Sequence, residues 1–315
     1  MEVETEVVTE QENAGASEPV RRHLPVLLQE VITGINPQPG DLILDGTVGA
    51  GGHAAALLEL TSPNGRLLGL DLDEVALETA HKNLARFGSR VMLVRGSYRQ
   101  AAPIAAANNL GPFQAVLLDL GFSSMEIDDP TRGFSFRKDG PLDMRYDTSQ
   151  ELTAAEIVNT WSREDLVRIL QLYGEEKFAY RIADALVTAR KRNRFSGTLE
   201  LVEAIAACVP NKYVHGPISC ATRTFQALRI AVNDELGNLE KALPDLLDLL
   251  APGGRLAIIA FHSLEDRIVK QFMRREEKTG RLTPQTKRPV EAGEQELRLN
   301  SRARSAKLRV AIKNF

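Results

Sequence analysis

The stretch from Asp41 to His53, DLILDGTVGAGGH, constrains this chain more than any other part of it. A short apolar run leads directly into a glycine-rich turn, and residues 54–60 then have an apolar pattern typical of a helix. A strand, a glycine-rich turn and a helix in this order open a doubly wound parallel sheet. Glycine lets the backbone approach a ligand closely, and the helix start offers unpaired N–H groups. The stretch therefore predicts a binding loop at the edge of a sheet.

A carboxylate follows the loop at the distance expected for a residue that binds a ribose. Residues 66–70 form a second predicted strand, and it ends in Asp71. This acid lies about twenty residues beyond the glycines, where a carboxylate can accept hydrogen bonds from both hydroxyls of a ribose. Turn glycines alone would be a weak signal. Together with the flanking elements and the acid, they predict a site for a nucleoside-containing cofactor.

Strand and helix patterns alternate up to residue 124. Further strands are predicted at 91–94 and 115–118, and helices at 74–86 and 101–109. This alternation predicts an α/β fold with a parallel, doubly wound sheet. Asp45, Asp71 and Asp119 each follow a predicted strand, so we expect them to border one crevice at the carboxyl edge of the sheet.

The alternation stops over residues 125–220, which begin with a polar, turn-rich stretch. Helical patterns then cover 153–160, 162–173, 175–190 and 198–208, and strand patterns return only at 255–261 and 307–313, the last expected to be an edge strand. Residues 279–305 look irregular and basic. We therefore expect a discontinuous sheet domain, 23–124 and 221–315, with a helical substrate-recognition insertion at 125–220 over its carboxyl edge.

Composition excludes several classes of protein. The chain is 43% hydrophobic and 26% charged, as soluble globular proteins are, and no apolar run is long enough to span a membrane. Its two cysteines, Cys208 and Cys220, suit a reducing cytoplasm, and its histidines lack metal-ligand spacing. Residues 1–22 lack the features of a secretory signal and are predicted to be a disordered acidic tail.

The basic residues are concentrated late in the chain. From Arg267 to Arg309, 13 Lys and Arg stand against 5 Asp and Glu, which indicates either a phosphate-facing surface or a solvated charged segment. In the predicted helix from residue 221, side chains at steps of three and four form a polar stripe that could hold a base or phosphates: Arg223, Gln226, Arg229 and Asn233. Taken alone, such a stripe is more often a solvated helix face.

A loop with two aromatic residues is the third candidate for chemistry. Phe134 and Phe136 lie between basic residues in RGFSFRK. They could stack on a base turned out of its helix, or they could hold the loop against the core.

These motifs together resemble the ribosomal small-subunit methyltransferase H family, also called MraW. The matching segments are HLPVLL (23–28), DGT with GGH (45–53), LLDLG with SS (117–124), RGFSF and DGPLDMR (132–145), YGEE (173–176), ATRTFQALRI (221–230), APGGRL with FHSLEDRIVK (251–270) and SRARSAKLR (301–309). They run in order along nearly the whole chain from residue 23. Three positions depart from the family pattern: Glu126 replaces a usual glutamine, and Val48 and Cys220 replace a usual phenylalanine and proline.

The resemblance implies a class I methyltransferase that uses S-adenosylmethionine to methylate N4 of a specific cytidine in the decoding region of 16S rRNA. It assigns cofactor binding to Gly51, Gly52, His53, Asp71, Tyr98, Asp119 and Glu126. As a hypothesis, Asp119 or Ser123 lies near the reacting amino group, because the strand before them ends beside the methyl donor. The small ribosomal subunit is the expected partner, in the cytoplasm and without a membrane, and a homodimer remains one option.

Three other functions stay open. A DNA amino-methyltransferase would show an Asp/Asn-Pro-Pro-Tyr/Phe loop after the fourth strand, and DLGFSS is not that loop. A nicotinamide oxidoreductase would bind NAD in place of S-adenosylmethionine. A ribosome-assembly factor would bind the cofactor without turnover.

Overall fold

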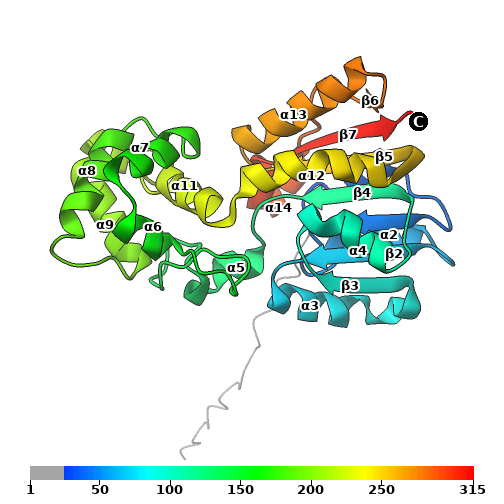
Figure 1. Cartoon of the computed structure of the whole chain (residues 1–315), viewed down its shortest axis with the longest axis horizontal. Helices are drawn as coiled ribbons and strands as arrows, with labels where there is room; N and C mark the ends of the chain where they lie inside the picture. The colour runs from blue at the N-terminus through cyan, green and yellow to red at the C-terminus, as the bar shows by residue number, and fades with distance from the viewer. Residues whose placement is uncertain (1–24) are drawn as a thin grey trace, which may run out of the picture.

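A seven-stranded sheet forms the centre of the larger part of the molecule (Figure 1). The computed structural model describes residues 25–315, and the predicted acidic tail lies outside these residues. The sheet has the order β3-β2-β1-β4-β5-β7-β6, in which β7 is antiparallel to both its neighbours and the first five strands are parallel. The strands are β1 (Leu42–Asp45), β2 (Arg66–Asp71), β3 (Val91–Arg95), β4 (Phe113–Asp119), β5 (Leu250–Ala260), β6 (Leu282–Pro284) and β7 (Lys307–Lys313). The predicted α/β fold is confirmed.

Helices cover both faces of the sheet because side chains along each strand alternate between the faces. Leu44 and Leu118 pack with α4 (Ala101–Ala107), α12 (Glu235–Leu249) and α13 (Ser263–Lys278). Ile43 and Leu117, one residue earlier on the same strands, pack with α1 (Leu28–Ile35), α2 (Gly52–Leu60) and α3 (Glu74–Leu84). These strands are buried on both sides, as strands of a parallel sheet are.

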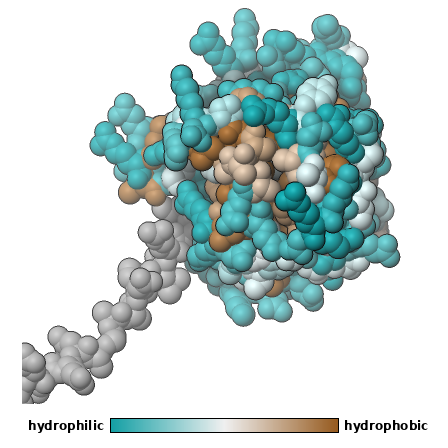
Figure 2. Space-filling model, turned by 90° about the vertical axis from the view of Figure 1, so that its left-hand side faces the viewer, coloured by the Kyte–Doolittle hydropathy of each residue, from teal (hydrophilic) through white to brown (hydrophobic). Residues whose placement is uncertain are grey.

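The helices α6 to α11 form a second body with its own apolar core, to the left of the sheet in Figure 1. They are α6 (Ala154–Thr160), α7 (Arg163–Leu172), α8 (Ala179–Ala189), α9 (Thr198–Cys208), the short α10 (Asn211–Val214) and α11 (Thr222–Asn233). Phe225 and Leu228 of α11 lie in this core, whereas the apolar side chains of α12 pack on the sheet. Figure 2 looks onto this helical end, where hydrophobic side chains gather among hydrophilic ones.

Two predictions about the late part of the chain are wrong. Residues 307–313 form β7, which lies between β5 and β6 and is therefore not an edge strand. Residues 279–305 are not wholly irregular, since they contain β6, α14 (Glu294–Leu299) and a 3₁₀ turn at Ser301–Arg304. A strand of three residues and a helix of six are too short to show a periodic pattern.

A loop after β4 joins the two bodies. It contains α5 (Ser124–Asp128), and its Arg132 is 2.8 Å from Asp73 at the start of α3. Asn233 at the end of α11 accepts a hydrogen bond from the backbone of Tyr146 at 2.8 Å and donates one to the carbonyl of Met144 at 2.8 Å. The loop is thereby attached to the sheet at one end and to the helices at the other. Within residues 25–315, no helix combines the length and apolar character that crossing a membrane requires.

Candidate cofactor and substrate site

The glycine loop is held against the carboxyl ends of three strands by its own backbone. Gly46 donates to the carbonyl of Leu117 and Val48 to that of Leu70, each at 2.9 Å. Gly49 and Gly51 have φ of +51° and +83°, a region in which only glycine is unstrained. These hydrogen bonds therefore fix the loop to β4 and β2, and its glycines carry no side chain over the backbone.

Asp71 orders this loop from the next strand. Its Oδ2 accepts a hydrogen bond from Gly49 N at 2.8 Å, and its Oδ1 accepts one from Asp73 N at 2.9 Å. Burial raises the pKa of the Asp71 carboxyl, and these backbone donors oppose the shift. Each oxygen keeps a second lone pair, which suits the predicted contact with ribose hydroxyls.

Asp119 is the least satisfied acid of the site. Its backbone N–H donates to Thr47 Oγ1 at 2.6 Å, and its Oδ2 is 3.8 Å from Nδ1 of His53. Its Oδ1 is buried and has no hydrogen-bond partner within residues 25–315. Burial raises the pKa of Asp119, although His53 and Arg302 oppose the shift. An unpaired buried oxygen of this kind is costly unless a ligand supplies a donor.

His53 is fixed by a contact with the N-terminal helix region. Its Nε2 lies 2.9 Å from the carbonyl of Val26, and because a carbonyl only accepts, this nitrogen carries the hydrogen. The ring is buried, and it presents Nδ1 to Asp119. His53 therefore lies beside the Asp119 carboxylate and links the start of α2 to the segment before α1.

The crevice concentrates negative charge, as the strand-end pattern predicts. Asp45 is 2% exposed, and burial together with the charges of Asp119 and Asp71 raises its pKa to about 7. Such a crevice attracts a cation and repels phosphate. Acids placed in this way suit the cationic sulfonium group of a cofactor.

Glu126 and Ser123 cap the short helix α5 in a reciprocal pair. Glu126 Oε2 accepts from Ser123 N at 2.7 Å, and Ser123 Oγ accepts from Glu126 N at 3.2 Å. This is a capping box, and it explains why an acid is tolerated here. Burial raises the pKa of Glu126 to about 7, with the charges of Asp71 and Asp73 adding to the shift. The hydroxyl of Ser123 is thus partly engaged in structure.

Tyr98 lies against the glycine loop from the end of β3. It begins a 3₁₀ turn at Tyr98–Gln100, and its Cβ is so close to Gly46 that a side chain at residue 46 would lie 2.9 Å from it. Tyr98 is half-buried, and burial raises the pKa of its hydroxyl. The seven residues predicted to bind the cofactor thus lie on the turns after β1 to β4, at one edge of the sheet.

The predicted polar stripe on α11 is not one exposed surface. Arg229 is 8% exposed, and its guanidinium donates to both oxygens of Glu235 at 2.8 and 3.0 Å. The side chain of Gln226 donates to the carbonyl of Tyr173, and Asn233 holds the connecting loop. Arg223 alone is directed outward, where it donates to the carbonyl of Glu175. Most side chains of the stripe therefore bond to other parts of the protein, because this helix is packed on several sides.

Arg302 lies at the site, although the sequence pattern did not single it out as a site residue. Its guanidinium donates to the carbonyl of Phe122 at 2.9 Å, just after β4, and its charge acts on Asp119 and Glu126. Nearby in the sequence, Glu296 accepts a hydrogen bond from Leu27 N at 2.8 Å. The motif SRARS marks this segment in the sequence, but the motif does not show which residue Arg302 contacts in the folded protein.

Glu235, His262 and Glu265 form the only group with metal-ligand spacing within residues 25–315, their ligand atoms lying within 4.8 Å of one another. Both oxygens of Glu235 are already held by Arg229. Burial and the charge of Arg229 lower the pKa of His262 to about 3, so its ring is neutral. We interpret the group as a buried ion-pair network that joins α11, α12 and α13 rather than as a metal centre.

The fold and the site define a class of protein. A parallel sheet with an antiparallel strand inserted near one edge, a bare glycine loop, and acids after β2 and β4 are the features of a class I S-adenosylmethionine-dependent methyltransferase. The residues fit this cofactor because acids border the crevice and the carboxylate oxygens of Asp71 keep lone pairs for ribose hydroxyls. The predicted oxidoreductase alternative finds no such support.

The comparisons with known proteins identify the family. A family model described as the MraW methylase family matches residues 20–314, and the chain therefore belongs to that family. A ribosomal RNA small subunit methyltransferase H of Symbiobacterium thermophilum is 47% identical over 306 residues, which cover 92% of this chain and 96% of the relative. The corresponding protein of a Nostoc species is 48% identical over 296 residues, 94% of each chain. A solved rRNA methylase of Streptococcus thermophilus aligns with 96% of this chain and all of its own at 12% identity, with a TM-score of 0.43.

Proposed function

We propose that this enzyme methylates N4 of a specific cytidine in the decoding region of 16S rRNA, with S-adenosylmethionine as methyl donor. The curated relatives, at 47% and 48% identity over most of the chain, are named for the small-subunit RNA. The observation that carries the choice of an amino nitrogen is the unpaired buried Oδ1 of Asp119, an acceptor at the end of β4. A nicotinamide reaction has no comparable support.

Positioning supplies most of the catalysis in this proposal. When bound, S-adenosylmethionine supplies a methyl group that is already activated by the sulfonium charge. The lone pair of the cytosine amino group is delocalised into the ring, so the protein must turn it toward the methyl donor. Asp119 Oδ1 accepts one N–H of the amino group, directs the nitrogen lone pair, and lies ready for the proton that the nitrogen loses.

Binding of the cofactor falls to the sheet edge. Gly51 and Gly52 let the backbone approach it, Asp71 accepts from its ribose, and Tyr98 flanks the loop. His53 lies beside Asp119 and is fixed by the carbonyl of Val26. Ser123 and Glu126 shape the loop after β4 through their capping pair and so support the site.

Recognition of the RNA falls to the helical body and the loop before it. Residues 125–220 and α11 carry this role in our proposal, with the boundary after α11 rather than at residue 221. Arg223 is the one residue of the predicted stripe that remains available to a phosphate. A homodimer and a cytoplasmic location stay predictions.

The experiment is methyl transfer from labelled S-adenosylmethionine to small ribosomal subunits from cells that lack this enzyme, followed by nucleoside analysis. Label in N4-methylcytidine supports the proposal. Label in another nucleoside corrects the target atom. Cofactor binding by calorimetry without any transfer, to subunits or to naked rRNA, favours the assembly factor.

A further inference from the structure

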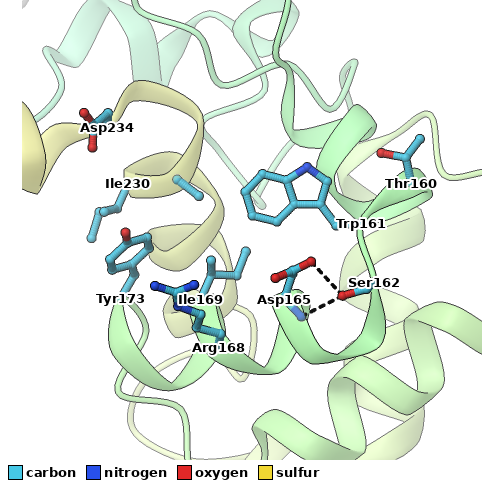
Figure 3. Close-up of a pocket in the computed structure, with 10 residues that line it drawn as sticks. Thr160, Trp161, Ser162, Asp165, Arg168, Ile169, Tyr173, Ile230 and Asp234 are labelled. Atoms are coloured by element: carbon cyan, nitrogen blue, oxygen red, sulfur yellow. Dashed lines mark hydrogen bonds between the residues drawn. The ribbon is translucent and has the colours of Figure 1, made fainter.

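A hollow opens on the helical body between α7 and the end of α11. Its volume is about 590 Å³, in the range of ligand sites. The floor is apolar, since Ile169 and Ile230 are 5% and 1% exposed. Figure 3 shows the rings of Trp161 and Tyr173 on opposite sides of this space. Two aromatic walls above an apolar floor suit a flat ring.

The polar groups of the hollow suit the edge of such a ring. The indole N–H of Trp161 makes no hydrogen bond to any residue in the range 25–315, and Arg168 is exposed and makes no ion pair within that range. Asp165 is engaged by Ser162 and Asp234 by Lys241 at 3.7 Å. These carboxylates still have lone pairs, so the hollow offers both donors and acceptors to a ligand.

A basic loop is tied to the helix that leads into the hollow. Arg190 donates to the carbonyl of Val158 at 2.8 Å, and the side chain of Asn159 makes two hydrogen bonds to the backbone of Phe195 at 2.8 and 2.9 Å. Residues 160 and 161, which follow directly, line the hollow. The loop over residues 190–195 is therefore fixed to the end of α6, directly before the residues that line the hollow.

The loop carries cations that the protein does not neutralise. Lys191 and Arg192 are exposed, and neither forms an ion pair within the described part of the chain. Arg194 is 3.9 Å from Glu156, at the limit of an ion pair. Unpaired cations beside a flat-walled hollow match a nucleotide, with its phosphates on the loop and its base in the hollow.

We propose that this hollow binds an unpaired base of the RNA substrate, stacked on Trp161, while Lys191 and Arg192 hold the flanking phosphates. This inference rests on the proposed RNA substrate. The hollow adjoins the end of α11 that holds the connecting loop, because Asp234 lines it and the preceding Asn233 bonds to Met144 and Tyr146. The bound base is a second one, separate from the methylated cytidine. The acceptors Asp165 and Asp234 favour a base with an amino group over uracil.

The chain contains a single tryptophan, so its fluorescence reports on this hollow alone. The probe is a single-stranded oligoribonucleotide with the decoding-region sequence, and its binding is followed in parallel by anisotropy of an end label. We expect Trp161 emission to be quenched along the same binding curve. Trp161→Ala lowers affinity about tenfold, Trp161→Phe retains most of it, and Tyr180→Ala, on an exposed position of α8 outside the hollow, leaves it unchanged.

Salt dependence tests the loop. The double variant Lys191→Ala/Arg192→Ala lowers the slope of log affinity against log salt by about 1.4, as expected for two lost phosphate contacts on a single strand. The matched control Arg66→Ala/Lys82→Ala, on exposed positions of β2 and α3 outside the basic segment 267–309, keeps the slope. RNA binding by anisotropy with unchanged Trp161 emission overturns this inference and leaves the proposed function standing. Absence of RNA binding together with absence of methyl transfer overturns both.

Discussion

At the scale of single residues, Asp119 gives the sharpest expectation. Asp119→Asn keeps the shape and one acceptor oxygen but removes the charge that, in the proposed reaction, receives the amino proton. We expect turnover to fall about 100-fold while the dissociation constant for S-adenosylmethionine changes less than about tenfold. Single-turnover methyl transfer and calorimetry measure the two quantities. Asp128→Asn, an exposed acid of α5, is the control, and full turnover in Asp119→Asn would remove the catalytic role.

We expect Glu126 to make cofactor affinity depend on pH. Because burial raises its pKa to about 7, the carboxyl is mainly protonated at pH 6 and mainly ionised at pH 8. A cationic cofactor binds the ionised form better, so affinity should rise with pH across this window, by about threefold or more. Glu126→Gln reduces this rise, and Asp45, with a pKa also raised to about 7, supplies the rest. Calorimetry from pH 6 to 8 checks this, and an unchanged profile in the variant would count against it.

A site residue could be predicted from the sequence only where neighbouring residues in the chain determine its position. Gly51 and Asp71 could be placed from the sequence because strand ends and turns fix them. Arg229 could not, since its partner Glu235 lies beyond a helix break at Asp234, whose φ is +45°. Arg302 could not either, because it meets the loop after β4 only in the folded protein.

At the scale of elements, the junction of α11, α12 and α13 depends on Arg229. Arg229→Met leaves Glu235 buried without its partner, and this should lower the free energy of unfolding by about 3 kcal/mol. Arg223→Met, on the partly exposed side of the same helix, should change it by less than about 1 kcal/mol. Urea unfolding with matched slopes measures both. Equal stability of the two variants would return Arg229 to the list of substrate-binding candidates.

Helices and strands, like single residues, could be predicted where a local sequence pattern defines them. The first four strands and the helix at Glu74–Leu84 were predicted within a few residues, because each has an apolar pattern and clear boundaries. The position of β7 between β5 and β6 could not be predicted, since pairing between distant strands depends on the whole sheet. The strand β6 could not be predicted either, because three residues are too few to show an alternating pattern.

At the scale of the whole molecule, the two bodies have separate cores and should open separately. We expect S-adenosylmethionine to slow amide hydrogen exchange in the β1–α2 loop and the strands around it, and to leave α7 to α9 largely unaffected. Exchange measured by mass spectrometry with and without the cofactor checks this. Equal protection of both bodies would show a single cooperative unit instead.

Arg302 and Glu296 have a consequence for the timing of synthesis. The ribosome makes them after every other residue of the site, yet they fasten the loop beyond β4 and the start of α1. A nascent chain can fold its first strands and glycine loop early, but it cannot finish the edge around Asp119 until translation is nearly complete.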